Sequence, residues 1–124
     1  MGITKIFSSV DVMRPPKTTI AIGLWISLPG SFDVVTAFET IYFWPDIEHC
    51  FNEVKKVLKP GGQFVIVNES DGSGEMDAKW ESMIEGMHTY TPEEIRRHLT
   101  NVGFRDLNIT VNEEKRWLCA TAGK

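Results

Sequence analysis

Cysteine is scarce in this sequence, and acidic residues outnumber basic ones. The 124 residues include two cysteines, Cys50 and Cys119, so one chain can form neither a disulfide framework nor a zinc site with four thiolates. Lysine and arginine total 13 against 17 aspartate and glutamate residues, for a formal net charge of -4. This balance argues against a nucleic-acid binder, because such proteins use basic side chains to neutralise phosphates.

Long apolar runs and targeting segments are also missing. The longest apolar run, 20–28, is about half as long as a membrane-spanning helix. No charged N-terminal region precedes an apolar stretch with a small-residue cleavage site. We therefore expect a cytoplasmic protein that does not act at a membrane. With 42% hydrophobic and 24% charged residues, the composition is that of a globular protein, and the length favours a single domain, 1–124.

Apolar segments rich in β-branched residues predict about five strands. The first three carry little charge, as strands buried inside an α/β sheet do. The last two are shorter and follow one another closely, which favours an antiparallel pair. The expected strands cover residues 18–26, 32–38, 63–68, 107–111 and 116–122.

Three further segments have apolar residues at helical spacing. Residues 46–59 form the first expected helix, with a possible cap at Asp46. Residues 76–87 form the second. Its methionine stripe, Met76, Met83 and Met87, could be an adaptable substrate lid, although core packing is the simpler interpretation, and we expect this face to pack in the core. A Thr-Pro-Glu-Glu capping box at 91–94 begins the third helix, which Gly103 ends. Strand, helix and strand with short connections between 32 and 68 predict a right-handed βαβ unit.

Three motifs follow one another between Phe32 and Gly62. They are Phe-Asp-Val-Val at 32–35, the aromatic-rich segment 38–46, and Glu-Val-Lys-Lys-Val-Leu-Lys-Pro-Gly-Gly at 53–62. Their order and spacing closely resemble the fourth and fifth strands, with the connecting helix, of class I S-adenosylmethionine-dependent methyltransferases. The nearest subgroup includes the ubiquinone and menaquinone biosynthesis enzymes. The resemblance covers residues 27–122 and implies the C-terminal half of a Rossmann-like methyltransferase sheet.

This resemblance implies methyl transfer from S-adenosylmethionine to a small-molecule acceptor. In open α/β sheets, ligands bind beyond the carboxyl ends of the parallel strands. In the family, the end of the fifth strand, here Asn68 and Glu69, borders the acceptor pocket. The positions that pass beside the methionine part of the cofactor correspond here to Ala37, Phe38, Glu39 and Thr40. For Glu39, the alternative is a solvated carboxylate in a loop.

Two residues are candidates for a catalytic role. Tyr42 lies in the aromatic segment that could wall the site, although core packing is its simpler interpretation. His88 precedes the capping box, where the family has residues that face the substrate, and could act as a base; the alternative is a surface histidine. His49 and Cys50 have no third ligand nearby, so we expect no metal site.

The family's glycine-rich cofactor turn has no counterpart here. Before Phe32, glycine occurs only at positions 2, 23 and 30, and residues 1–26 form an atypical N-terminal segment. Two functions follow: a methyltransferase that is active through an assembly, or a non-catalytic remnant that serves as an interaction or oligomerisation module. Because strand 32–38 lacks its usual neighbour, we expect 18–26 to cover its edge, or two chains to pair as a homodimer.

Overall fold

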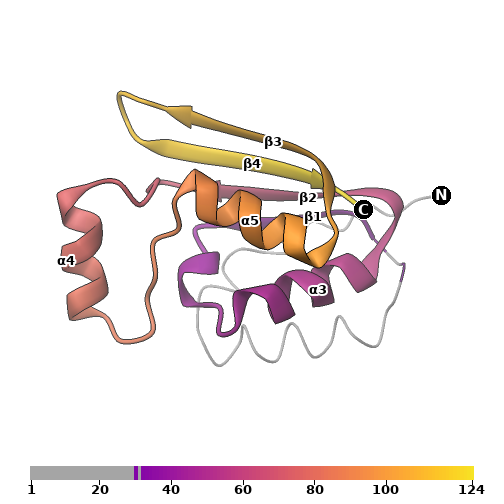
Figure 1. Ribbon diagram of the computed structural model, residues 1–124, viewed down its shortest axis with the longest axis horizontal. Coiled ribbons are helices and arrows are strands. Elements are labelled where there is room, and N and C mark those ends of the chain that lie inside the picture. Colours follow the sequence, from indigo (N-terminus) through magenta and orange to yellow (C-terminus); the bar gives the residue numbers. More distant parts are fainter. Residues whose placement is uncertain (1–29, 31) are drawn as a thin grey trace.

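The computed structural model describes residue 30 and residues 32–124, so the strand expected at 18–26 lies outside the described residues. The described part contains one four-stranded sheet, three α-helices and one short 3-10 helix (Figure 1). In chain order, the elements are β1 (Phe32–Phe38), η1 (Ile41–Phe43), α3 (Ile47–Val57), β2 (Leu58–Asn68), α4 (Glu75–Met83), α5 (Pro92–Val102), β3 (Arg105–Asn112) and β4 (Trp117–Gly123).

The sheet has the strand order β1-β2-β4-β3. β1 and β2 are parallel and are joined by α3, which confirms the expected βαβ unit. β4 is antiparallel to both β2 and β3, which confirms the expected C-terminal pair. The α/β fold class is therefore confirmed, and the sheet is mixed because the last strand inserts between β2 and β3.

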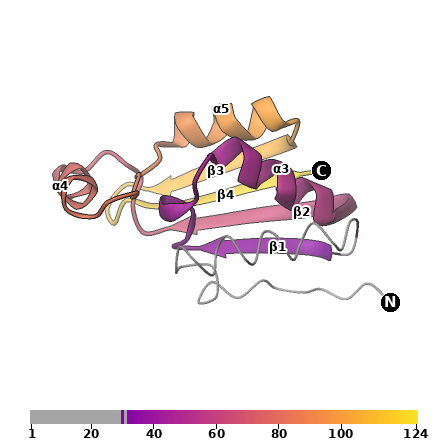
Figure 2. The same ribbon diagram turned by 90° about the horizontal axis from the view of Figure 1, so that it is seen from below.

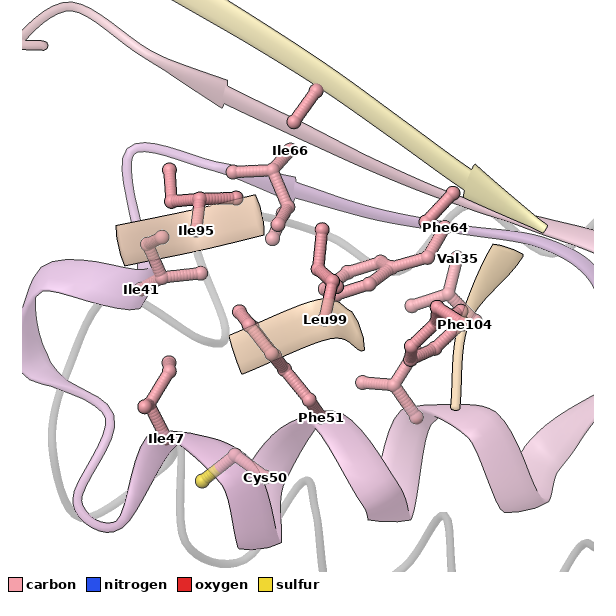
Figure 3. Close-up of a cluster of buried hydrophobic side chains, with 14 of the residues drawn as sticks. Val35, Ile41, Ile47, Cys50, Phe51, Phe64, Ile66, Ile95, Leu99 and Phe104 are labelled. Carbon is pink, nitrogen blue, oxygen red and sulfur yellow. The ribbon is translucent and has the colours of Figure 1, made fainter. Parts of the chain in front are cut away.

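Two helices cover one face of this sheet. α3 and α5 lie side by side on it in both views (Figures 1 and 2). Between the helices and the strands, Phe51 of α3 and Phe64 of β2 have ring centroids 5.5 Å apart, and Leu99 of α5 is fully buried beside them (Figure 3). Burying each such side chain stabilises the fold by roughly 1.5–3 kcal/mol. This shared core fixes the position of both parallel strands.

The helix boundaries follow their capping residues. The Asp46 carboxylate accepts a hydrogen bond from the backbone N–H of His49, as expected for the first turn of α3. Thr91 and Glu94 form the expected reciprocal capping box at the start of α5. Gly103 ends α5 with φ 97°, a conformation that favours glycine.

The boundary between α3 and β2 differs from the prediction. The helix ends at Val57 rather than at 59, and β2 begins at Leu58 rather than at 63. The cause is Pro60, because a proline disfavours helical backbone at the residue before it. The Pro-Gly-Gly segment is thus part of an irregular strand, and the register between β1 and β2 shifts near its beginning.

The expected packing of the second helix was wrong. α4 ends at Met83 rather than at 87, and it lies beyond the end of the sheet (Figure 1). Its apolar face is largely exposed: the exposed fractions are 52% for Met76, 43% for Trp80 and 64% for Met83. The one buried residue within α4 is an acid, Asp77. Helical spacing specified the face but not a surface for it to pack on.

Candidate functional site

A cavity lies where the carboxyl ends of β1 and β2 meet the start of α4. Its volume is about 390 Å³, in the range typical of small-molecule sites. Open α/β sheets bind ligands at this edge. The residues that line it are Glu39, Tyr42, Glu69, Ser70, Met76, Asp77, Trp80, Met87 and Thr89.

A hydrogen-bond network fixes Glu39 at the rim of this cavity. Glu39 follows β1 and has φ 55°, which turns the chain out of the strand. Its Oε1 accepts hydrogen bonds from the Tyr42 hydroxyl at 2.9 Å and from the backbone N–H of Glu69. The backbone N–H of Ser70 donates to the Tyr42 oxygen at 3.2 Å. The ends of the two parallel strands are thereby tied together through one carboxylate.

Tyr42 serves this network as a hydrogen-bond donor. Its side chain is 5% exposed, and burial followed by the neighbouring Glu39 carboxylate raises the pKa of its hydroxyl far above the ordinary value. The hydroxyl therefore stays protonated and holds Glu39 in place. Of the two interpretations of Tyr42, burial supports packing, and the hydroxyl adds a positioning contact at the cavity.

A second carboxylate anchors α4 beside the cavity. Asp77 accepts hydrogen bonds from the Ser70 hydroxyl at 2.5 Å and from the backbone N–H of Gly74 at 2.9 Å. Asp77 is 9% exposed, so these contacts compensate for its burial. α4 is held to the end of β2 by polar contacts, and its apolar side chains remain available to the cavity.

The chemistry of the cavity wall is acidic and apolar. Glu39, Glu69 and Asp77 supply three carboxylates, and Trp80 with two methionines supplies the apolar part. No lysine, arginine or histidine is among the described residues that line it. A ligand that carries positive charge is favoured there, because carboxylates attract cations and aromatic faces do as well.

His88 lies near this cavity but does not line it. Its Nδ1 is 3.2 Å from Glu81 and its Nε2 is 2.9 Å from Glu94, so both ring nitrogens face carboxylates. Burial alone would raise the pKa of Glu94, but hydrogen bonds from the Thr91 backbone and from His88 outweigh burial and lower that pKa. The structure therefore places His88 in a bridge between the segment after α4 and the first turn of α5.

The sequence-predicted residues divide into two groups. Glu39, Tyr42 and Glu69 line the cavity. Ala37, Phe38, Thr40, Asn68 and His88 do not, although the first four are at the same strand ends. Ala37 is buried in the core and Phe38 is 40% exposed.

Sequence reasoning missed Ser70, Asp77 and Thr89 as lining residues. Ser70 is close to Glu69 in the chain, so its place beyond β2 was a usable signal. Asp77 had a weaker signal, because it is a polar residue within an apolar helical pattern. Thr89 had none, since it reaches the cavity because the Glu81 carboxylate accepts hydrogen bonds from its N–H and hydroxyl.

Two buried polar side chains at the strand ends lack hydrogen-bond partners. The hydroxyl of Thr40 and both side-chain polar atoms of Asn68 are buried, with no hydrogen-bond partner in the described part of the chain. Such groups are costly unless something pairs with them. Neither side chain lines the cavity, so Glu39 at its rim is the group that fits a ligand with positive charge. Within residues 32–124, no cluster of three side chains suits a metal ion.

Comparison with known proteins points to one class. Residues 26–66 match a family described as methyltransferase domain. A sterol 24-C-methyltransferase of Clavispora lusitaniae is 36% identical over 110 residues, which are 77% of this chain and 29% of that protein. Phosphoethanolamine N-methyltransferase 2 of Caenorhabditis elegans is 37% identical over 55 residues, 44% of this chain and 13% of that protein.

Solved structures share the fold. A SAM-dependent methyltransferase of Thermotoga maritima superposes with a TM-score of 0.65 at 18% identity, over 77% of this chain and 57% of that one. The Haemonchus contortus phosphoethanolamine N-methyltransferase 2, solved with phosphomonomethylethanolamine and S-adenosylhomocysteine, gives a TM-score of 0.65 at 16% identity, over 78% and 34% of the two chains.

These findings support a relationship to the class I S-adenosylmethionine-dependent methyltransferases. The cofactor implied by that resemblance is S-adenosylmethionine. This chain spans less than a third of the length of the two curated relatives. Among the described helices, none is long and apolar enough to cross a membrane.

Proposed function

We propose that this chain takes part in S-adenosylmethionine-dependent methyl transfer to a small-molecule acceptor, with the strand-end cavity as the site. The observation that carries the proposal is Glu39, whose Oε1 is fixed by Tyr42 and by the Glu69 backbone at the edge where such sheets bind ligands. Glu39 Oε2 takes no part in this network and is available for a cationic ligand group. The motif at 53–62 supports the finer assignment to the ubiquinone and menaquinone biosynthesis subgroup.

Each strand end has a separate role in this proposal. Bound S-adenosylmethionine would supply a methyl group activated by a cationic sulfonium. Glu39 at the rim of the cavity would hold a positively charged part of the cofactor. Trp80 and the methionines would exclude water, and the rigid strand ends would align the two reactants.

A second function is favoured by a different observation. The sequence before Phe32 has no glycine-rich turn, which in the family forms the opposite wall of the cofactor site. On this hypothesis the chain is a non-catalytic module that pairs with a second copy, for which the edge of β1 is the proposed contact. Light scattering measures the mass, and a dimer fits both functions. A dimer that shows no saturable S-adenosylhomocysteine binding by calorimetry fits only this one.

Isothermal titration of the full chain with S-adenosylhomocysteine tests the main proposal. We expect saturable binding that weakens about tenfold in Glu39→Gln, since a charge-assisted hydrogen bond contributes roughly 1.5–3 kcal/mol. Glu85→Gln is the matched control, because Glu85 is exposed and does not line the cavity. Absence of saturable binding by the folded wild-type chain would contradict the proposal and leave the non-catalytic module.

A further inference from the structure

The geometry points to an acceptor class for this site: we propose that the acceptor carries a cationic nitrogen beside an apolar body, recognised by Glu69 and Trp80. This inference rests on the proposed methyl transfer and adds what the acceptor must look like. It is argued from the part of the cavity on the β2 and α4 side, since Glu39 on the β1 side is assigned to the cofactor.

Glu69 supplies the charge that would select a cationic nitrogen. Its backbone N–H is engaged with Glu39, and its carboxylate lies at the exposed end of β2. Asp77, the neighbouring acid, is already paired with the Ser70 hydroxyl and the Gly74 N–H. Within the cavity the hydroxyl of Thr89 also donates to Glu81. The polar side chains that remain for a ligand are therefore mainly acceptors of hydrogen bonds, which suits a donor with positive charge.

The apolar body of the acceptor would pack on α4. Met76 and Trp80 are one helical turn apart and both line the cavity, yet they are 52% and 43% exposed. Large apolar side chains of this kind are covered in most proteins, and those left open in a concave site mark a contact surface. The indole of Trp80 serves both parts of the ligand, because an aromatic face attracts a neighbouring cation.

A second cavity contains basic residues, so it provides an alternative site at which an anionic group of an acceptor could be recognised. It has a volume of about 550 Å³, shares Glu69 and Asp77 with the first, and extends to Lys115 and Arg116 in the turn between β3 and β4. The Arg116 guanidinium lies against Gly74, with Nη1 2.5 Å from the position that a Cβ would take there. An acceptor recognised by an anionic group would bind near these two basic residues instead.

The experiment uses two indole probes that differ in charge. Tryptamine and indole-3-acetate are titrated into the full chain by calorimetry, with and without saturating S-adenosylhomocysteine. We expect tryptamine to bind and indole-3-acetate to bind far more weakly. Glu69→Gln, which keeps the backbone N–H and the side-chain size, is expected to weaken tryptamine binding about tenfold, whereas Glu85→Gln leaves it unchanged. Trp80→Ala is expected to weaken both probes.

The outcomes separate this inference from the proposed function. Equal binding of the two probes, no binding of tryptamine, or tryptamine binding that Glu69→Gln does not change would overturn the acceptor class. Indole-3-acetate binding that weakens in Arg116→Gln would also overturn it, because the anion site would then be the recognition site. Failure to bind S-adenosylhomocysteine contradicts the proposed function, whereas tryptamine binding lost in Glu69→Gln still supports the cationic site.

Discussion

The three α-helices in the described part of the chain all have apolar residues at helical spacing, but they behave differently in the fold. α3 and α5 place their apolar stripes against the sheet, where Phe51, Ile95 and Leu99 are fully buried. α4 has apolar residues at similar spacing, but Met76 and Trp80 remain exposed beyond the end of the sheet. The first two helices are held by a shared core, whereas α4 is held by Ser70 and Asp77.

This difference distinguishes the helices that support the fold, α3 and α5, from the helix that contributes to the candidate site, α4. A face that packs on the sheet is constrained by its neighbours, so its residues contribute mainly to stability. A face that is held in place by polar contacts at one edge can stay open and offer apolar surface to a ligand. The comparison predicts that changes in α3 and α5 alter the free energy of unfolding, and that changes around α4 alter binding.

The largest expected effect is on the scaffold. Phe51→Ala removes a ring that contacts Phe64 and Trp44, and we expect it to lower the free energy of unfolding by about 3–5 kcal/mol. Trp80→Ala, the matched change on α4, is expected to cost less than about 1 kcal/mol, because the side chain is 43% exposed. Urea unfolding measures both. Equal losses of unfolding free energy in the two variants would contradict the distinction between α3 and α4.

The capping box of α5 is expected to have a smaller effect, which again concerns the stability of the scaffold. Thr91→Ala removes the hydroxyl that accepts the Glu94 N–H, and we expect it to lower the free energy of unfolding by about 1 kcal/mol. Thr91→Ser keeps that acceptor and is the control. A loss as large in Thr91→Ser as in Thr91→Ala would show that the hydroxyl is not what stabilises the start of α5.

At the strand ends, Thr40→Val tests a buried residue that does not line the cavity. The change replaces a hydroxyl that has no partner among the described residues, so the free energy of unfolding should stay the same or rise by up to about 1 kcal/mol. S-adenosylhomocysteine affinity should stay unchanged. Calorimetry and urea unfolding of the same variant test this pair of expectations. A fall in affinity would contradict the account, because it would show that the ligand contacts Thr40 outside the cavity.

A further effect on stability concerns alkaline pH. Burial, with the nearby acids Asp46 and Glu53, raises the pKa of the Cys50 thiol from 9.0 to about 12. A raised pKa in the folded state gives stability that is present below pH 9.0 and is lost as the pH rises toward about 12. Burial likewise raises the pKa of Tyr90 to about 12, so it acts in the same direction.

Urea unfolding at about pH 8 and about pH 10.5 measures this loss. We expect the free energy of unfolding to be lower at the higher pH, and the difference to shrink in Cys50→Ala. That variant also removes a buried side chain, so the comparison is between its own two pH values. Stability that rises over this interval would contradict the assignment of Cys50 to the buried face of α3.

The sequence predicted the scaffold well because its signals are local or periodic. The stripe that contains Cys50 and Phe51 predicted α3, and the Thr91 capping box placed the start of α5 to the residue. The position of β2 was less accurate, because the extended conformation before Pro60 let the strand begin at Leu58. The core face expected for 76–87 failed because periodicity does not say what a face packs against.

The site was predictable only in part for the same reason. Glu39 and Glu69 were named because they follow strands whose parallel arrangement could be expected. Asp77 and Thr89 reach the cavity through hydrogen bonds to residues nearby in the chain, Ser70, Gly74 and Glu81, and no motif in the sequence marks those contacts as part of a site. His88 was named from its position before the capping box, and its pairing with Glu81 and Glu94 depends on the path of the chain after α4.

Backbone amide chemical shifts of the isotope-labelled full chain during titration with S-adenosylhomocysteine test the central claim most directly. The claim is that the ends of β1 and β2 bind ligands while α3 and α5 serve as scaffold. We predict saturable shift changes at Glu39, Tyr42, Glu69 and Ser70, with little change in α3 and α5. Saturable changes confined to α3 and α5, or none at the strand ends, would contradict this account.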